Sequence, residues 1–109
     1  MKNLILNVGL ASADGIPYGT AMAAAAVDHL LWTLENLGVP APNITARGEG
    51  QYTADNGVTY REPCLSLTWY GVGHLDAVKQ AASVWCRQHE QESYALQIAE
   101  VTIIPAGGA

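Results

Sequence analysis

The chain has 109 residues, of which 50% are hydrophobic and 14% are charged. This composition excludes a disordered polypeptide, and the length allows one domain whose core needs neither a metal nor a disulfide. Five Lys and Arg residues against ten Asp and Glu residues give a formal charge of −5, which argues against nucleic acid and anionic membranes as partners. The acidic residues are spread along the chain, unlike those of a DNA mimic.

The first ten residues carry one positive charge and an apolar run that Asn7 and Gly9 interrupt. Such a pattern fits neither a secretion signal nor a membrane span, so we expect a cytoplasmic protein. The two cysteines, Cys64 and Cys86, fall in a predicted strand and a predicted helix. We expect two buried free thiols, with a strand–helix disulfide as the alternative.

Apolar side chains alternate with Asn, Ile and Gly from Asn3 to Leu10, which predicts a half-buried first strand. A helix is expected from about Tyr18 or Thr20 to Leu37, because apolar residues recur there at three- and four-residue spacing. Gly38 is the residue expected to end this helix.

A β-hairpin is predicted around Asp55-Asn56-Gly57, between the alternating runs Ile44–Tyr52 and Val58–Tyr70. Asn-Gly is the strongest short hairpin signal, because both residues tolerate the positive φ of a type I′ turn. In the first run, small residues are expected to face the helices and polar residues to face outward. The small residues are Ile44, Ala46, Gly48 and Gly50, and the polar residues are Thr45, Arg47, Glu49 and Gln51.

A second helix is expected from Leu75 to His89 or Glu90, followed by a strand over Tyr94–Ile104 with a bulge near Ala99-Glu100. The order βαββαβ predicts an α+β, ferredoxin-like fold, with a four-stranded antiparallel sheet and two helices. Right-handed crossovers would place both helices on the same sheet face. Residues 1–104 should form a single domain, and residues 105–109 a flexible tail.

The uncovered sheet face is expected to be polar and mostly uncharged. Such a face meets water, binds a ligand or packs against a second copy, so we expect a homo-oligomer, most simply a homodimer. Trp32 and Tyr70 are the candidate interface residues, since exposed aromatic side chains often anchor interfaces. The alternative for Trp32 is a ring that lies flat over the rim of its own domain.

The sequence contains no phosphate loop, no nucleotide fingerprint and no cluster with metal-ligand spacing. His29, His74 and His89 fall on different predicted elements, which favours structural or exposed roles over metal ligation. Cys64 has no histidine near it in sequence, as a catalytic pair formed by neighbours would require. We therefore predict no catalytic residue, no metal and no cofactor.

A candidate ligand-binding cluster consists of Gln51, Tyr52, Arg61 and Glu62. Closure of the hairpin would bring Tyr52 close to Tyr60 or Arg61 across the ladder. An amide, a phenol, a guanidinium and a carboxylate can together hold a small polar ligand. The alternative is an exposed Arg–Glu pair beside a hairpin, which contributes little to stability.

Several short motifs are similar to those of a family of small, uncharacterised bacterial proteins. The matching residues are Gly50-Gln51-Tyr52, Arg61-Glu62 and Gln91-Glu92-Ser93, together with Gly9 after the first strand. In that family a strand ends near a Gly-Gln-aromatic triplet, Arg-Glu follows, and a helix leads to Gln-Glu-Ser before the last strand. Many members are secreted, whereas no secretion signal is expected here. Because the family has no established activity, the resemblance implies the fold more than a function.

Three functions are compatible with this sequence. The favoured one is a non-enzymatic protein that binds a small ligand or a partner. The second is a small enzyme of the dimeric α+β barrel type, with a pocket between sheet and helices where Tyr18, Trp69, Tyr70 or His74 supplies the chemistry. The third is a phage or mobile-element inhibitor that occludes a host protein surface, with Trp32 as its anchor.

Overall fold

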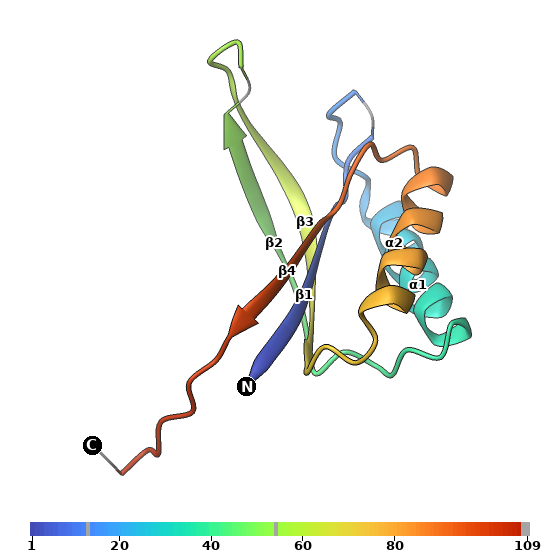
Figure 1. Ribbon diagram of the computed structural model, residues 1–109. Coiled ribbons are helices and arrows are strands. Elements are labelled where there is room, and N and C mark those ends of the chain that lie inside the picture. Colours follow the sequence, from blue (N-terminus) through green and yellow to red (C-terminus); the bar gives the residue numbers. More distant parts are fainter. Residues whose placement is uncertain (13, 54, 108–109) are drawn as a thin grey trace.

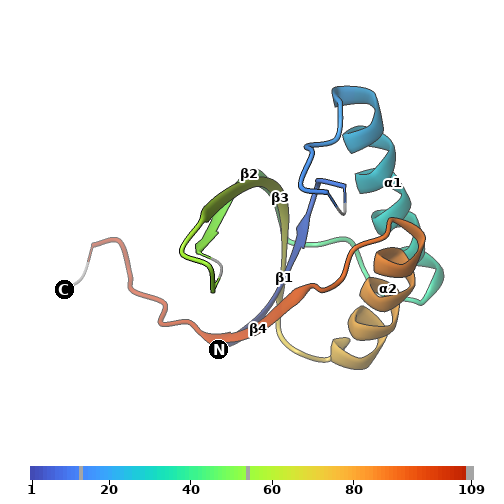
Figure 2. The same ribbon diagram turned by 90° about the horizontal axis from the view of Figure 1, so that it is seen from above.

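The computed structural model describes residues 1–12, 14–53 and 55–107, and of Tyr52 the backbone alone. Its elements are β1 (Lys2–Gly9), α1 (Thr20–Asn36), β2 (Ile44–Thr53), β3 (Thr59–Tyr70), α2 (Leu75–Gln88) and β4 (Ala95–Glu100). The strands form an antiparallel sheet in the order β2-β3-β1-β4, and both helices lie on one side of it (Figures 1 and 2). The predicted α+β fold with ferredoxin-like element order is confirmed.

The core lies between the two helices and the central strands β1 and β3. Leu4 and Leu6 of β1 stand opposite Trp69 and Leu67 of β3. Directly opposed residues of an antiparallel pair point to the same face, so these side chains form one apolar layer beneath the helices. The helices complete the core with buried residues: Ala26, Leu30 and Leu34 from α1, and Val78, Ala81, Ala82 and Trp85 from α2.

Both helices end in the same hydrogen-bonding pattern, but with different residues. After α1, Gly38 has a φ of 77°, and the Val39 N–H donates to the Leu34 carbonyl at 3.0 Å, as in a Schellman motif. After α2, Glu90 takes the left-handed position with a φ of 55°, and the Gln91 N–H donates to the Cys86 carbonyl at 2.8 Å. Gly38 confirms the predicted end of α1, whereas Glu90 occupies a position that glycine usually takes.

The hairpin is present, but its connection is longer than a type I′ turn. Thr53 stands opposite Thr59, so residues 54–58 join the two strands. Gly57 has a φ of 82°, whereas Asn56 has no positive φ. The Asn56 side chain instead accepts a hydrogen bond from the Val58 N–H at 3.0 Å, which stabilises the loop locally.

The predicted facing of β2 is wrong. Arg47 stands opposite the buried Leu65, so its side chain points to the sheet face that carries the helices, and Gly50 stands opposite Glu62 on the open face. The physical reason is that the helices do not bury β2: apart from Gly50, every β2 residue whose burial is described is exposed. Small residues are therefore not required on the helix side, and alternation alone does not identify the covered face.

The last strand is shorter than predicted. Glu100 stands opposite Lys2, at the start of β1, so the ladder ends where its partner strand begins. The Val101 N–H still donates to the Met1 carbonyl at 2.8 Å, and the chain then leaves the sheet (Figure 1). Within the predicted tail, Gly108 and Ala109 lie outside the described residues.

Two further properties bear on the sequence-based expectations. Cys64 and Cys86 are both free thiols, with Cys86 buried and Cys64 partly buried. Burial raises the pKa of the Cys86 thiol, which keeps it protonated at neutral pH. In the part of the chain that the structure describes, neither helix combines the length and apolarity needed to cross a membrane.

A chain of aromatic ring contacts connects α1 with the end of α2. The Trp85 indole N–H donates to the Ala26 carbonyl at 2.9 Å, and the His89 ring lies 4.8 Å from the Trp85 ring. His89 Nε2 shares a hydrogen bond of 3.0 Å with His29 Nδ1, and the His29 ring stacks on exposed Trp32. The structure thus brings together two histidines that the sequence analysis left on separate elements.

Replacing Trp85 by Phe should lower the free energy of unfolding by about 2 kcal/mol, because it leaves a void in the core and removes the hydrogen bond to Ala26. Trp32→Phe is the matched control: Trp32 is 60% exposed, so its loss should stay within about 0.5 kcal/mol. Urea denaturation followed by circular dichroism measures both changes. Equal losses would contradict the assigned packing of Trp85.

Stability should also depend on pH through His89, whose pKa lies below its ordinary value of 6.5 because of burial and the neighbouring His29. The unfolded chain therefore takes up this proton at a higher pH than the folded chain. The contribution of neutral His89 to the free energy of unfolding is therefore fully present above pH 6.5. It is lost as the pH falls from 6.5 through the lower pKa of the folded protein.

The test compares melting temperatures of wild type and His89→Gln from about pH 7.5 down to about pH 5. Wild type should lose more stability than His89→Gln over this pH interval. The Asp and Glu residues are the same in both proteins, so their titration affects both melting curves equally. Parallel curves would show that His89 does not bind protons differently in the two states.

Candidate functional site

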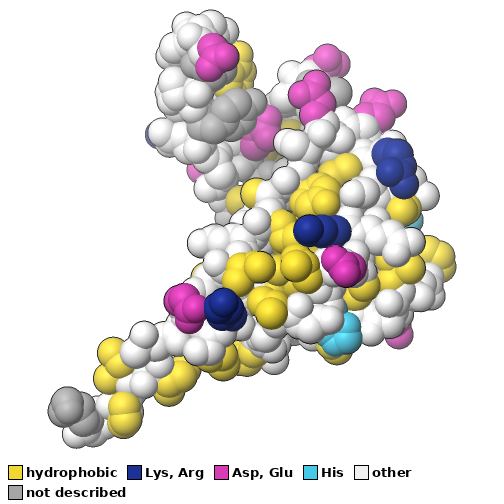
Figure 3. Space-filling model, viewed as in Figure 1, with side chains coloured by type: hydrophobic (Ala, Val, Ile, Leu, Met, Phe, Trp, Pro, Cys, Tyr) yellow, Lys and Arg dark blue, Asp and Glu magenta, His cyan; other side chains and the backbone are white. Residues whose placement is uncertain are grey.

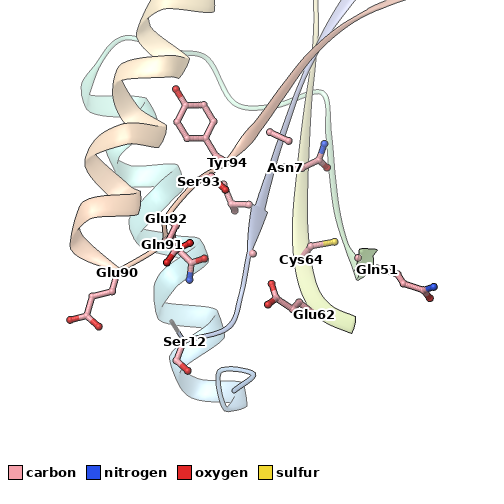
Figure 4. A pocket seen from close by; sticks show the side chains of 14 residues that line it. Asn7, Ser12, Gln51, Glu62, Cys64, Glu90, Gln91, Glu92, Ser93 and Tyr94 are labelled. Atoms are coloured by element: carbon pink, nitrogen blue, oxygen red, sulfur yellow. The ribbon is translucent and has the colours of Figure 1, made fainter. Parts of the chain in front are cut away.

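A cleft of about 670 Å³ opens where the end of β1 meets the β2–β3 hairpin and the segment that leads from α2 into β4 (Figure 4). Its walls come from segments far apart in sequence. The lining residues are Asn7, Val8, Gly9, Ser12, Gly50, Gln51, Glu62, Cys64, Glu90, Gln91, Glu92, Ser93, Tyr94 and Ala95. A volume of this size is within the range of small-molecule sites, roughly 300–1,000 Å³.

Most residues of the family-like motifs meet in this cleft. Gly9 stands opposite Cys64 in the β1–β3 ladder, and Gly50 stands opposite Glu62 in the β2–β3 ladder. Opposed residues share a face, so the ladders bring these four positions to the open side of the sheet. Gln91-Glu92-Ser93, in the segment between α2 and β4, forms another wall of the cleft. The motif residues that line the cleft are Gly9, Gly50, Gln51, Glu62, Gln91, Glu92 and Ser93.

The predicted ligand cluster is divided by the sheet. Glu62 is partly buried and lines the cleft, whereas its neighbour Arg61 is exposed and points to the opposite face, as successive strand residues do. Gln51 stands opposite Arg61, and its side chain extends away from Glu62 at the rim (Figure 4). The side chain of Tyr52 lies outside the described residues. Of the three cluster side chains that the structure describes, Glu62 is the one that the fold directs inward.

Gly9 lies where two cleft walls come close to the β1 backbone. A methyl group added to its Cα would lie 3.3 Å from Gln91 Oε1, slightly closer than ordinary van der Waals contact, and 3.4 Å from Glu62 Oε2, at the lower limit of such contact. The two oxygens therefore converge on one small space above Gly9, from two different walls. Absence of a side chain at Gly9 leaves this space open, and its backbone does not have a positive φ that would itself require glycine.

Gln91 is held by groups that lie behind the cleft wall. Its amide nitrogen Nε2 donates to the Ala11 carbonyl and, at 2.9 Å, to the Tyr18 hydroxyl. Tyr18 in turn donates its hydroxyl hydrogen to the His89 carbonyl at 3.2 Å. The loop before α1 supplies Ala11 and Tyr18, and the Leu10 carbonyl accepts the Tyr18 N–H at 3.0 Å. These contacts anchor the Gln91 amide to the Ala11 carbonyl directly and to the His89 carbonyl through the Tyr18 hydroxyl.

The cleft is acidic. Glu62, Glu90 and Glu92 line it, and its described lining includes neither Lys nor Arg. The Glu90 carboxylate extends outward, whereas Glu62 faces the interior (Figure 4). In the surface view, acidic side chains lie on both sides of the hollow between the hairpin and the helices (Figure 3). Such a site favours a positively charged ligand.

Metal binding finds no support in the described side chains: they include no group of three or more His, Cys, Asp or Glu residues placed to hold a metal ion. The His29–His89 contact is a direct hydrogen bond between the two rings. Cys64 lines the cleft as a free thiol, and the described lining of the cleft includes no histidine.

The two candidate interface residues lie on different surfaces. Trp32 is 60% exposed on the outside of α1, while Tyr70 is 54% exposed at the end of β3. Tyr70 follows the buried Trp69, so it points to the open sheet face. A single flat contact would therefore not include both, and their role at an interface stays a prediction.

Residue-by-residue reasoning missed Gln91 and assigned Tyr18 only a possible role in chemistry. Neither periodicity nor a local motif identifies Gln91 or Tyr18 as a residue of the site, because the two residues that contact each other lie far apart in the sequence. The one signal in the sequence was the Gln91-Glu92-Ser93 part of the family resemblance. That signal placed Gln91 near the last strand but gave no partner for it.

No model of a known protein family matches the sequence, and no curated protein matches it either. Solved structures do share the fold, as two examples show. A phage SAM lyase in complex with S-methyl-5′-thioadenosine has a TM-score of 0.67 at 17% identity, covering 91% of this chain and 80% of that chain. A DUF3240 family protein from Shewanella baltica OS155 has a TM-score of 0.55 at 10% identity, covering 96% and 94%. At such low identities the likeness shows a common fold, and the motif-based resemblance stays a prediction.

Proposed function

We propose that the cleft binds S-adenosylmethionine and that the chain cleaves this molecule, releasing S-methyl-5′-thioadenosine. The observation that carries the proposal is the acidic cleft, in which Glu62 faces inward and the described lining includes no Lys or Arg. The fold shared with a phage SAM lyase in complex with S-methyl-5′-thioadenosine supports this choice among cationic ligands.

Charge complementarity selects the ligand class. S-adenosylmethionine carries positive charge on its sulfonium sulfur and on its ammonium group, and negative charge on its carboxylate. Three glutamates around a cleft attract a molecule of net positive charge, and the attraction strengthens where water is partly excluded. A nucleoside phosphate would instead be repelled by the same residues.

The reaction makes few demands on the protein. The bond between the sulfonium sulfur and the γ-carbon of the amino-acid part breaks, and its electron pair returns to the sulfur. The departing thioether is neutral and needs no proton from an acid. The remaining four-carbon fragment balances the charge in one of two ways: its own carboxylate bonds to the γ-carbon, or it loses a β-proton to form an alkene. Nuclear magnetic resonance of the product distinguishes these routes.

This proposal gives preference to the enzyme hypothesis, but at a different location and with different residues. Trp69 is buried in the core, where its indole N–H donates to the Pro40 carbonyl at 2.8 Å. Tyr70 and His74 are exposed and do not line the cleft. Tyr18 acts behind the wall by holding Gln91. The inhibitor hypothesis rests on Trp32 as an anchor for a partner protein. The Trp32 ring stacks on His29 of its own chain, which fits the alternative role at the rim of the domain.

The test incubates the purified protein with S-adenosylmethionine and measures S-methyl-5′-thioadenosine by liquid chromatography. Wild type should release the product, and Glu62→Gln should lower kcat/KM by about tenfold to a hundredfold, because it removes a charged partner from the site. Glu49→Gln is the matched control, since Glu49 is exposed on β2 and lies outside the cleft lining. Its activity should equal that of wild type.

Two other outcomes have distinct meanings. Binding of S-adenosylmethionine in calorimetry without product release would reject the lyase and support the non-enzymatic ligand-binding hypothesis. Neither binding nor release would reject the whole proposal.

A further inference from the structure

The orientation of the Gln91 amide follows from two backbone carbonyls. The Ala11 carbonyl can only accept, so the group that contacts it must be the amide nitrogen Nε2. The His89 carbonyl likewise takes the hydroxyl hydrogen of Tyr18, which leaves the Tyr18 oxygen to accept from the same Nε2. Both amide hydrogens of Gln91 are thus used behind the wall, and Oε1 must face the cleft.

Gln91 Oε1 and Glu62 Oε2 therefore form a pair of acceptors around the space above Gly9. Within the described part of the chain, neither oxygen accepts a hydrogen bond from a protein group. A carboxylate and an amide oxygen that converge on one point suit a ligand group with several donors and positive charge. A primary ammonium meets both conditions, because it has three hydrogens and one unit of charge.

The chemistry of the proposed reaction indicates which positive charge belongs in this space. The sulfonium charge disappears as the carbon–sulfur bond breaks, so a carboxylate beside the sulfur would stabilise the substrate more than the transition state. The ammonium keeps its charge throughout the reaction. Holding the ammonium therefore orients the amino-acid part without raising the barrier.

We infer that Gln91 Oε1 and Glu62 Oε2 together bind the α-ammonium group of the substrate in the space that Gly9 leaves open. The inference rests on the proposed function and assigns a specificity role to Gln91, with Tyr18 as its positioning residue. It predicts that the protein discriminates between adenosyl ligands with and without an amino-acid part.

The experiment measures the affinities of two unreactive probes by calorimetry. S-adenosylhomocysteine contains the ammonium and a neutral sulfur, and S-methyl-5′-thioadenosine has no amino-acid part. Gly9→Ala places a methyl group between the two oxygens and should weaken S-adenosylhomocysteine about tenfold or more, while changing S-methyl-5′-thioadenosine by less than about twofold. Gln91→Ala should have the same selective effect.

Gly48→Ala is the matched control for Gly9→Ala. Gly48 and Gly9 stand opposite the same residue, Cys64, on its two neighbouring strands, but an added methyl group at Gly48 meets nothing within 4 Å. This variant should bind both probes as wild type does. Tyr18→Phe keeps the ring and removes the hydroxyl that orients Gln91, so a smaller loss for S-adenosylhomocysteine alone is expected.

The outcomes separate the inference from the proposed function. If wild type binds both probes and Gly9→Ala or Gln91→Ala weakens them equally, the ammonium subsite is wrong and the proposed function stands. If wild type binds neither probe and releases no S-methyl-5′-thioadenosine from S-adenosylmethionine, the proposed function fails and the subsite falls with it. If wild type binds neither probe but does release this product, the ammonium subsite alone is wrong. Circular dichroism of each variant identifies a loss that comes from unfolding, in which case Tyr18→Phe decides between selective and equal weakening.

Discussion

The register of the β1–β3 ladder positions both the apolar core and the cleft. Leu6 stands opposite Leu67 in the core, and Gly9 stands opposite Cys64 at the cleft. Because side chains alternate with a period of two, a slip of one residue would expose the core leucines and turn Glu62 away from the open face. The same pairing that buries the apolar layer therefore aims the inward carboxylate, and stability and site geometry are selected together.

The sequence was sufficient for the fold because its signals are local. Alternation in β1, the apolar stripe of α1, Gly38 and the Asn-Gly hairpin each depend on neighbouring residues, and the structure has the corresponding elements. The misassigned facing of β2 and the overlong β4 depend on which partner lies alongside each strand. Local patterns do not contain that information.

The site was less accessible to prediction for the same reason. Glu62 was identified, but it was grouped with Arg61, its neighbour in sequence, which alternation sends to the other face. The residue that actually approaches the space beside Glu62 is Gln91, across the sheet and after α2. Its hydrogen bonds to Ala11 and Tyr18 join residues that are 80 and 73 positions apart in the sequence. Only a pattern spanning the whole chain could have indicated this contact.

The two walls of the cleft differ in how firmly the rest of the protein holds them. Gln91 is tied to the helix end and to the loop before α1, next to the buried core. The opposite wall belongs to a hairpin that projects beyond the helices, and its outer strand β2 is exposed along nearly its whole length (Figure 1). Backbone amides near the hairpin tip should consequently exchange with deuterated solvent much sooner than those around Gln91. A ligand that bridges the walls would have to immobilise the hairpin, so part of its binding free energy would be spent on conformational entropy, and amide protection of the hairpin would report occupancy of the cleft.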